Sequence, residues 1–314
     1  MSDTGKQYIL SVSPHILTRD TTRRLMADVI IALLPAVAAA LYFFRLRAAM
    51  IMATCVISCV VFEYLYEKAA GRKISTGDYS AALTGVLLAM VLPPAMPLWA
   101  CAIGALIAIV LTKQMFGGLG ANIFNPALLG RAFLMAAFPV MLTTWSEPIT
   151  LDAITGATPL GLFKFEHVVT GSWPLLLGNV SGSLGETSGI ALIAGGLYLL
   201  ARKVIDYRIP AAYILAVAGI SFITHMVSPG SYAPVVFHLL AGGLLLGAFF
   251  MATDPVTSPV TKKGRWIFGA GCGVITMVIR LWGGLPEGVM YSILLMNALT
   301  PLINRATMPR RFGT

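Results

Sequence analysis

The chain has 314 residues, of which 57% are hydrophobic and only 11% are charged. An ordinary soluble domain has about 45–50% apolar and about 25% charged residues, so this composition excludes a soluble globular protein. Apolar runs that approach or exceed about 20 residues predict membrane-spanning helices, packed as an all-α bundle. The net charge of +9 does not indicate a nucleic-acid partner, because the basic residues lie in short connectors rather than in one patch.

Residues 1–24 are predicted to be a cytoplasmic N-terminal segment rather than a cleaved export signal. They contain Lys6, Arg19, Arg23 and Arg24 and lack an early apolar core. The first apolar run, which begins at Leu25, is therefore expected to remain as a membrane span.

The pattern of apolar runs predicts ten spans. The third and sixth are short for a full crossing, and Pro93, Pro94 and Pro97 follow the third, which predicts broken or re-entrant helices. The spans are predicted at residues 25–44, 48–66, 79–92, 95–112, 123–142, 189–201, 209–227, 235–252, 265–281 and 286–304.

The four cysteines, Cys55, Cys59, Cys101 and Cys272, all lie inside predicted spans. They lack the second pair or the nearby His that a metal site needs, so we expect packing thiols and no metal.

Basic residues divide unequally between alternate connectors. Seventeen lie on one side and three, Arg45, Arg47 and Lys164, lie on the other. Because Lys and Arg concentrate in cytoplasmic connectors, this asymmetry predicts an even number of spans with both termini in the cytoplasm. The seventeen are Lys6, Arg19, Arg23, Arg24, Lys68, Arg72, Lys73, Lys113, Arg202, Lys203, Arg208, Lys262, Lys263, Arg265, Arg305, Arg310 and Arg311.

One connector, residues 143–188, is far longer than the others and falls on the outer side. A loop of this length is usually functional. It separates a first five-span half (25–142) from a second (189–305), which a cytoplasmic tail (306–314) follows. The segments FGGLGANIFNPALLGRA and WGGLPEGVMYSILLMNALTP occupy similar places in the two halves. Duplicated five-span halves would be inverted in the membrane, whereas close helix packing explains the shared glycines without duplication.

The outer loop contains the decapeptide LDAITGATPL, which is small and polar where its neighbours are apolar. Asp152, Thr155, Gly156, Ala157 and Thr158 form the pattern Asp-x-x-Thr-Gly-Ala-Thr. Gly and Ala leave the backbone bare, so a bulky partner can approach the Thr158 hydroxyl. From chemistry alone, a plain turn with a Ser/Thr cap is the simpler interpretation.

The pattern resembles the flavinylation motif Asp-x-x-(Ser/Thr)-Gly-Ala-(Ser/Thr). The whole chain, with its segment DPVTSPVTKKGRWIFG, resembles the NqrB/RnfD family on its Rnf side. The resemblance implies that Thr158 receives FMN as a phosphoester from a flavin transferase, with Asp152, Thr155, Gly156 and Ala157 as recognition elements. Thr155 stands where many members have Ser. The resemblance also implies a second, non-covalent flavin, riboflavin or FMN, whose pocket no residue identifies.

The family moves electrons between ferredoxin and NAD and couples this transfer to export of Na⁺ or H⁺. The sequence has no GxGxxG pattern and no iron–sulfur cysteine pattern. We therefore expect an electron relay without catalytic residues of its own, one of several subunits of an Rnf complex in the bacterial cytoplasmic membrane. Its flavin loop is expected to be periplasmic or extracellular.

Three alternatives remain open at this point. The family fold is similar to that of urea transporters, so a small-solute channel or carrier would suit inverted five-span halves. The others are a subunit of a Na⁺-pumping quinone reductase and a structural subunit whose loop stays unmodified.

Charged residues inside spans are candidates for ion coupling, because each costs at least about 2.5–3.5 kcal/mol at a helix centre unless it is paired or hydrated. Asp28 is the ion-path candidate. For Asp28, Glu63 and Asp254, interfacial groups that reach the headgroups are an equal alternative. Arg131 lies well inside a span and is expected to contact the flavin or form a structural pair, whereas Arg280, near a span end, is expected at the interface.

Asn122 and Asn125, in the segment GANIFNPA, are expected to cap a helix that begins at Pro126, or to bind the cofactor. His225 and His238 flank an outer connector and are expected to be ordinary interfacial residues.

Overall fold

The computed structural model describes residues 21–146, 148 and 157–309, which form helices and turns with no β-strand among them. Three of these helices are long and apolar enough to cross a membrane, and several shorter apolar helices accompany them. The prediction of an all-α membrane protein is confirmed at this level, while the count of ten crossings stays a prediction. The three long helices are α1 (Thr22–Ala69), α9 (Arg208–Val227) and α12 (Lys262–Trp282).

The shorter elements fill the space between the long helices. They are η1 (Thr76–Asp78), α2 (Ser80–Met90), α3 (Leu98–Leu106), the π-helical η2 (Ile107–Gln114), α4 (Pro126–Ala137), α5 (Pro139–Thr143), α6 (Pro159–Glu166), α7 (Ser172–Leu177), η3 (Leu184–Glu186), α8 (Gly189–Ala201), α10 (Val235–Leu240), α11 (Leu244–Leu246), the π-helical η4 (Gly247–Met251) and α13 (Val289–Thr307).

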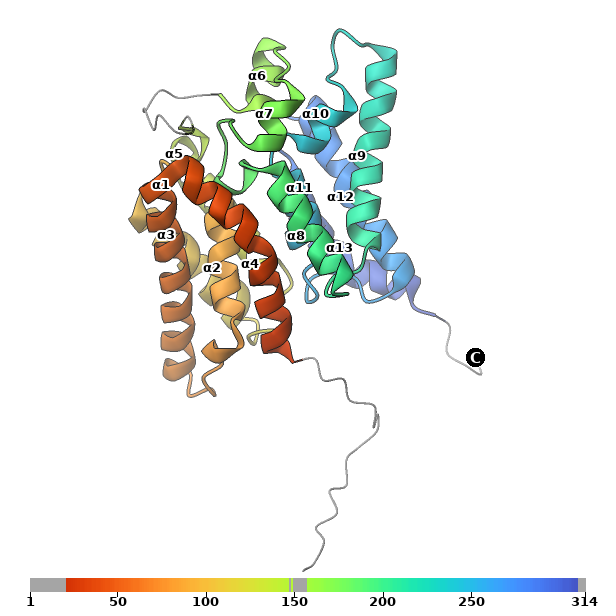
Figure 1. Cartoon of the computed structure of the whole chain (residues 1–314). Helices are drawn as coiled ribbons and strands as arrows, with labels where there is room; N and C mark the ends of the chain where they lie inside the picture. The colour runs from red at the N-terminus through yellow and green to blue at the C-terminus, as the bar shows by residue number, and fades with distance from the viewer. Residues whose placement is uncertain (1–20, 147, 149–156, 310–314) are drawn as a thin grey trace, which may run out of the picture.

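Helix α1 contains two of the predicted spans. Its first turn is capped by Thr21, whose hydroxyl accepts a hydrogen bond from the backbone N–H of Arg24 at 3.3 Å. Arg45 leaves the helical region, with φ 49° and ψ −131°, and the chain reverses there (Figure 1). The break falls in the connector that the sequence predicts between the first two spans.

Two predicted spans are wrong as continuous helices. The span at 123–142 divides at Pro139 into α4 and α5, because proline has no N–H to continue the helix. The span at 235–252 divides into α10, α11 and η4, because Gly242 adopts a left-handed φ of 71°. The predicted shortness of the third span is confirmed, since α2 ends at Met90 ahead of the prolines.

Close helix packing depends on a bare backbone at Gly195 of α8. A Cβ atom there would lie 2.1 Å from the carbonyl oxygen of Ala32 in α1. Helices in lipid associate through such tight contacts between small residues, because no hydrophobic effect drives them together. The four cysteines are buried and free, which confirms the prediction of packing thiols.

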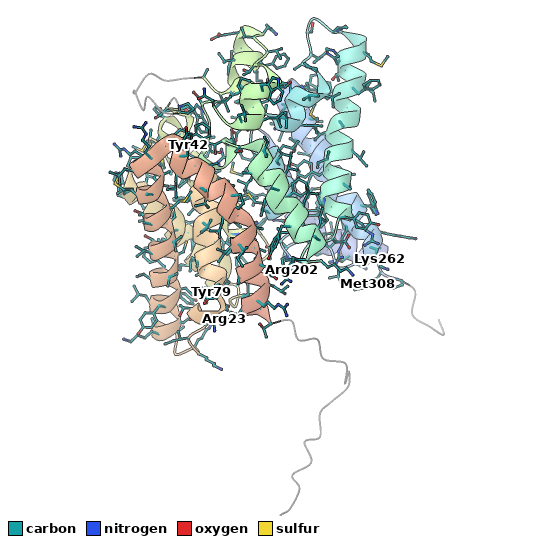
Figure 2. All side chains as sticks on the ribbon, in the orientation of Figure 1. Arg23, Tyr42, Tyr79, Arg202, Lys262 and Met308 are labelled. Carbon is teal, nitrogen blue, oxygen red and sulfur yellow. The ribbon has the colours of Figure 1, made fainter. Side chains whose placement is uncertain are left out.

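The long connector and several basic residues lie at opposite ends of the bundle. Helices α6 and α7 lie at the end away from the start of α1 and the end of α13 (Figure 1). Arg23, Arg202 and Lys262 lie at the terminal end, and Tyr42 at the other (Figure 2). This separation agrees with the predicted charge asymmetry. Which end faces the cytoplasm stays a prediction.

Asp206, in the connector between α8 and α9, joins two helices at the terminal end. Its carboxylate pairs with the guanidinium of Arg208 at 2.6 Å and with that of Arg265 at 2.5 Å. Burial alone raises the pKa of Asp206, but hydrogen bonds from the Arg208 N–H and from both guanidinium groups outweigh it and hold the pKa below its ordinary value. The carboxylate therefore contributes stability above the unfolded-state pKa of about 3.9, which is lost as pH falls through the lower folded-state pKa.

We expect Asp206→Asn to lower the unfolding free energy at pH 7 by about 1.5–3 kcal/mol, because hydrogen bonds to a charged group are lost. The difference in thermal midpoint between wild type and variant should narrow below about pH 4 as the wild-type carboxylate takes up a proton. Thermal unfolding in detergent at a series of pH values measures this, and a constant difference would contradict it.

Candidate functional site

Thr158 is the N-cap of α6. Its Oγ1 accepts a hydrogen bond from the backbone N–H of Gly161 at 3.1 Å, and Pro159 occupies the first helical position, where its missing N–H costs nothing. The geometry of a Ser/Thr cap that the sequence suggests is therefore present. An esterified threonine oxygen keeps a lone pair for that hydrogen bond, so the cap and a modification at Thr158 are compatible.

Thr158 lines a cavity of about 350 Å³, the outer cavity. Gly161 and Phe165 lie on the same face of α6, one and two turns along, and complete that wall. The opposite walls come from α4, from the end of α5 and the residues just after it, and from the segment between α12 and α13 together with the first turn of α13. Large side chains on them include Met135, Trp145, Met290 and Tyr291. Its volume is within the ~300–1,000 Å³ of small-molecule sites.

Of the predicted recognition elements, Ala157 is exposed and lines the outer cavity. The structure thus brings Ala157 and Thr158 together with Arg131 of α4. Asp152, Thr155 and Gly156 lie outside the described residues.

Arg131 lines the outer cavity and forms the structural pair that its position in a span predicts. Its Nη2 lies 2.8 Å from Glu287 Oε2, and only 4% of the residue is exposed. Its Nε is buried and has no partner among the described residues. The wall of this cavity thus contains a buried guanidinium with one N–H that no described residue uses.

Glu186 of η3 lies near Glu287 and Arg131 and interacts electrostatically with both. Ser183 Oγ donates to Glu186 Oε1 at 2.7 Å, which fixes this carboxyl group. The outer cavity is thus bordered by the guanidinium of Arg131 and the carboxyl group of Glu287.

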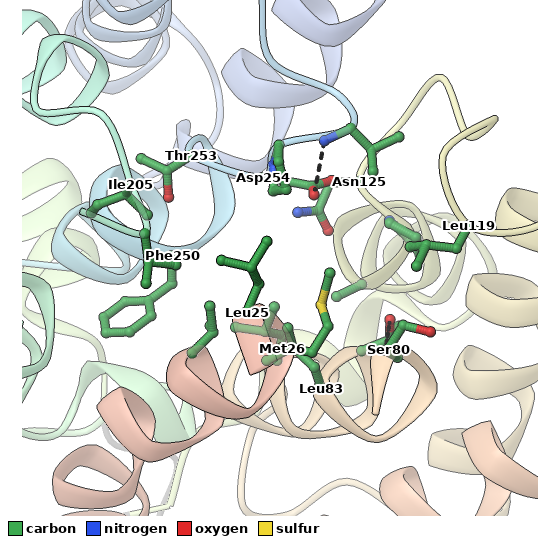
Figure 3. A pocket seen from close by; sticks show the side chains of 18 of the residues that line it. Leu25, Met26, Ser80, Leu83, Leu119, Asn125, Ile205, Phe250, Thr253 and Asp254 are labelled. Atoms are coloured by element: carbon green, nitrogen blue, oxygen red, sulfur yellow. Dashed lines mark hydrogen bonds between the residues drawn. The ribbon is translucent and has the colours of Figure 1, made fainter. Parts of the chain in front are cut away.

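A smaller cavity of about 110 Å³, the central cavity, lies between α1, α2, α4 and η4. Leu25, Met26 and Phe250 form part of its apolar wall, and Asn125 and Asp254 approach from the other side (Figure 3).

The predicted cap at Asn125 is confirmed. Its Oδ1 accepts from the backbone N–H of Leu128 at 3.3 Å, and its Nδ2 donates to the carbonyl of Met251 in η4 at 3.2 Å. Asn122 donates to the carbonyl of Phe124 at 3.2 Å and also lines the central cavity.

Glu63 and Lys113 form a fully buried ion pair between α1 and η2. Lys113 Nζ lies 2.5 Å from Glu63 Oε1 and 2.5 Å from Ser80 Oγ, and Gln114 Nε2 donates to the same Glu63 oxygen at 2.9 Å. The interpretation of Glu63 as an interfacial group is therefore wrong, and Lys113, counted with the connectors, is only 1% exposed. Each charge is buried because the other compensates it.

Asp28 pairs with Arg202, which directly follows α8, at 3.2 Å and accepts a hydrogen bond from Tyr198 of α8 at 3.4 Å. This partner joins α1 to α8 near the terminal end. A role of Asp28 in ion transport stays a prediction.

Two residues expected at the interface are buried, so those predictions are wrong. Arg280 is 5% exposed and donates to the carbonyls of His238 at 2.6 Å and Ala241 at 3.0 Å. His238 is 1% exposed. His225 is half-buried and its Nδ1 lies 2.7 Å from the carbonyl of Tyr232. The break at Gly242 explains why Arg280 and His238 are buried, because it leaves backbone carbonyls near α10 that accept hydrogen bonds from the Arg280 guanidinium.

Sequence reasoning missed two acidic residues of the site, Glu287 and the nearby Glu186. A signal existed: Arg131 inside a span requires a partner, and Glu287 is an acidic residue at the start of a predicted span. Arg131 and Glu287 are 156 positions apart, so the sequence alone does not show that they meet in the fold.

The chain is similar to known proteins over almost its whole length. Residues 9–313 match the model of the NQR2, RnfD, RnfE family. The D subunit of the Na⁺-translocating ferredoxin:NAD⁺ oxidoreductase complex of Acetobacterium woodii is 47% identical over 97% of this chain and 95% of its own length. The D subunit of the proton-translocating ferredoxin:NAD⁺ oxidoreductase complex of Clostridium ljungdahlii is 46% identical, over 98% and 96%.

A more distant relative is the D subunit of the ion-translocating oxidoreductase complex of Stutzerimonas stutzeri, which is 40% identical over 95% of this chain and 94% of its own. Similarity of this extent covers every helix described above. The family expected from the sequence is therefore confirmed, and the chain belongs to the NQR2, RnfD, RnfE family.

Proposed function

We propose that this chain is the membrane subunit of an Rnf-type complex, which moves electrons between ferredoxin and NAD and couples this transfer to export of Na⁺ or H⁺. Relatives that match it over almost their whole length bear names of this kind. The single observation that carries the electron-relay role is that Thr158 lines the outer cavity together with Arg131, whose buried guanidinium has an N–H without a partner among the described residues.

The outer cavity fits a covalent FMN on Thr158. The phosphoester would lie at the N-terminus of α6, where free backbone N–H groups and the helix dipole favour an anion. Arg131 Nε–H would add a charge-assisted hydrogen bond. Trp145, Phe165 and Tyr291 offer flat apolar surface for the flavin rings. When bound, the flavin supplies one- and two-electron transfer, while the protein supplies position and electrostatics.

A flavin transferase is the partner that this modification requires. Asp152, Thr155, Gly156 and Ala157 are its proposed recognition elements. Attachment before the loop settles against the outer cavity would give the enzyme access to Thr158, which is only 5% exposed in the folded chain.

We further propose that a second flavin, riboflavin or FMN, occupies the central cavity. Asn122, Asn125 and Asp254 line it and offer hydrogen-bond partners for the polar edge of a flavin. Its volume of about 110 Å³ requires apolar side chains such as Leu25 and Met26 to move aside.

Leu83 lines the central cavity, and Leu83→Trp should fill it. We expect this variant to release no flavin on denaturation while its covalent flavin band remains. The exposed Leu197→Trp is the matched control and should release as much flavin as wild type. Flavin release from Leu83→Trp at the wild-type level would count against this location.

The proposed topology is ten crossings in two inverted halves similar to urea transporters, with both termini cytoplasmic and the flavin loop periplasmic or extracellular. Support comes from the opposite positions of α6 and the basic residues, and from the short helical segments α2 and α11–η4 at matching places in the two halves. Broken helices at matching places are a feature of transporter halves.

Asp28 is proposed to lie on the ion path. Asp28→Asn should abolish ion transport by the assembled complex while covalent flavin remains, because only the carboxylate charge is removed. Uptake of Na⁺ and of H⁺ by inside-out vesicles measures this, and unchanged uptake eliminates Asp28.

A deletion strain tests the function as a whole. Membranes without this chain should lose ferredoxin-dependent NAD reduction together with ion uptake, and a plasmid copy should restore both. If both persist in the deletion strain, and liposomes that contain the purified chain pass urea, the solute channel becomes the better account.

A further inference from the structure

A third cavity, of about 230 Å³, lies on the opposite face of α6 from Thr158, and we call it the basic cavity. Leu160, Phe163, Lys164 and His167 line it, whereas Thr158, Gly161 and Phe165 line the outer cavity. The remaining walls include His238 of α10 and Arg280 of α12. Among the described residues, no carboxylate lines this cavity. Apart from the phenol of Tyr232, the ionisable groups that line it are basic.

Arg280 brings a buried cation to the basic cavity. Its two terminal nitrogens donate to backbone carbonyls, and its Nε is buried without a partner. Among the described residues it forms no ion pair within 4 Å. The carboxyl groups of Glu287 and Glu186 attract its charge only from beyond 4 Å, so an anion in contact with the guanidinium would stabilise it further.

The fold makes room for this guanidinium at Gly242. A Cβ atom there would lie 3.2 Å from Arg280 Nη2 and 2.6 Å from Leu160 Cδ1. With φ at 71°, Gly242 also has a backbone conformation that other residues rarely adopt. The glycine therefore lets Arg280 reach both the carbonyls and the cavity.

His238 adds a second set of unused polar atoms. Both ring nitrogens are buried and neither has a partner among the described residues. The ring packs edge-on against Phe163, with centroids 6.0 Å apart, so aromatic contacts hold it in place. A neutral imidazole carries one N–H donor and one acceptor nitrogen, and the described residues use neither.

Lys164 contributes positive charge and fixes the wall. Its Nζ, with three N–H donors, lies within hydrogen-bond distance of four carbonyl oxygens, those of Ile279 at 3.3 Å, Arg280 at 3.2 Å, Leu285 at 2.9 Å and Gly283. Burial lowers the pKa of the Lys164 ammonium. The ammonium caps the carbonyls at the end of α12 and keeps its charge, which favours an anion in the cavity.

We propose that the basic cavity binds a phosphate group. Its oxygens would accept hydrogen bonds from Arg280 Nε and from the His238 ring, and the Lys164 charge would reinforce both. Guanidinium groups suit phosphate because charge-assisted hydrogen bonds to its oxygens are strong.

Two sources carry this chemistry: the headgroup of an anionic phospholipid and free phosphate. Trp282, which is 64% exposed and follows Arg280 on α12, favours the lipid, because exposed tryptophans mark the level of the headgroups. A phosphate bound here would brace α6 from the face opposite Thr158, and this binding does not depend on the flavin.

The full chain, delipidated in phosphate-free detergent, tests the proposal by thermal unfolding. The probes are inorganic phosphate, short-chain phosphatidylglycerol and short-chain phosphatidylcholine. A saturating ligand should raise the midpoint by about 4 °C or more. A rise with phosphatidylglycerol alone identifies the lipid headgroup as the source, and a rise with inorganic phosphate as well identifies free phosphate.

Variants locate the effect. Arg280→Gln and His238→Asn should lose the rise, whereas Lys262→Gln, which removes an exposed charge at the other end of the bundle, should keep it. If Arg280→Gln does not fold, His238→Asn and Lys164→Gln test the proposal in its place, and both should lose the rise in midpoint. The proposal is overturned if neither anion stabilises the wild type more than phosphatidylcholine does, or if His238→Asn responds as fully as wild type.

Discussion

Thr158→Ala is expected to abolish covalent flavin entirely, because it removes the oxygen that a phosphoester requires. Thr158→Ser keeps this oxygen and the capping geometry and should retain the flavin. In-gel flavin fluorescence of the denatured chain, expressed together with a flavin transferase, measures both variants beside wild type.

The structural cost of these substitutions must be separated from the loss of flavin. Loss of an N-cap hydroxyl costs about 1 kcal/mol, so Thr158→Ala should still fold, with a slightly lower thermal midpoint. A folded Thr158→Ala protein with a wild-type fluorescent band would show that flavin is attached elsewhere. A dark band in wild type, despite an active transferase, would leave Thr158 as a helix cap alone.

Lys113→Met is expected to cause the largest loss of stability among single substitutions at the described ion pairs. The side chains of Lys113 and Glu63 are 2% and 0% exposed, so the variant would leave a buried carboxylate without its cation. Breaking a buried pair from one side costs about 3–5 kcal/mol. The thermal midpoint of the purified chain and its yield from membranes measure this loss.

Two controls test whether uncompensated charge is the cause. Adding Glu63→Gln to Lys113→Met removes the stranded charge and should recover most of the lost stability, because replacing both partners is often close to neutral. Lys68→Met removes an exposed lysine at the end of α1, the helix that contains Glu63, and should change stability by no more than about 0.5 kcal/mol. A double variant as unstable as Lys113→Met would contradict this explanation.

Local features of the fold were predictable from sequence because they depend on neighbouring residues. Asn125 ahead of Pro126 marks the start of α4, and Thr158 ahead of Pro159 marks the start of α6. The prolines after Met90 similarly mark the end of α2. Caps and prolines act within one turn of a helix, so their sequence positions fix where helices begin and end.

Contacts between distant segments were not predictable, because hydropathy reports only the local average. Lys113 counts as a connector residue by that measure, yet Glu63, 50 positions away, stabilises it in the interior. Arg280 lies near the end of an apolar run, but carbonyls exposed by the break at Gly242 draw it inward. In both cases a polar partner from another helix reverses the location that the local sequence indicates.

Part of the candidate site was foreseen and part was not. The hydroxyl of Thr158 came from a motif, and the need of Arg131 for a partner or cofactor came from its position within a span. The cavity that joins them lies between α6, α4 and the segment before α13. No local sequence pattern encodes this arrangement. Glu287 and Glu186 therefore emerged only from the structure.

Peptide mass spectrometry of the wild-type chain tests the central claim most directly. Trypsin should release residues 132–164 as one peptide, because no Lys or Arg lies between Arg131 and Lys164. We predict that this peptide is heavier by one FMN less one water, with fragment ions that locate the addition at Thr158. An unmodified peptide from protein made with an active transferase, or an addition at another residue, would contradict the account.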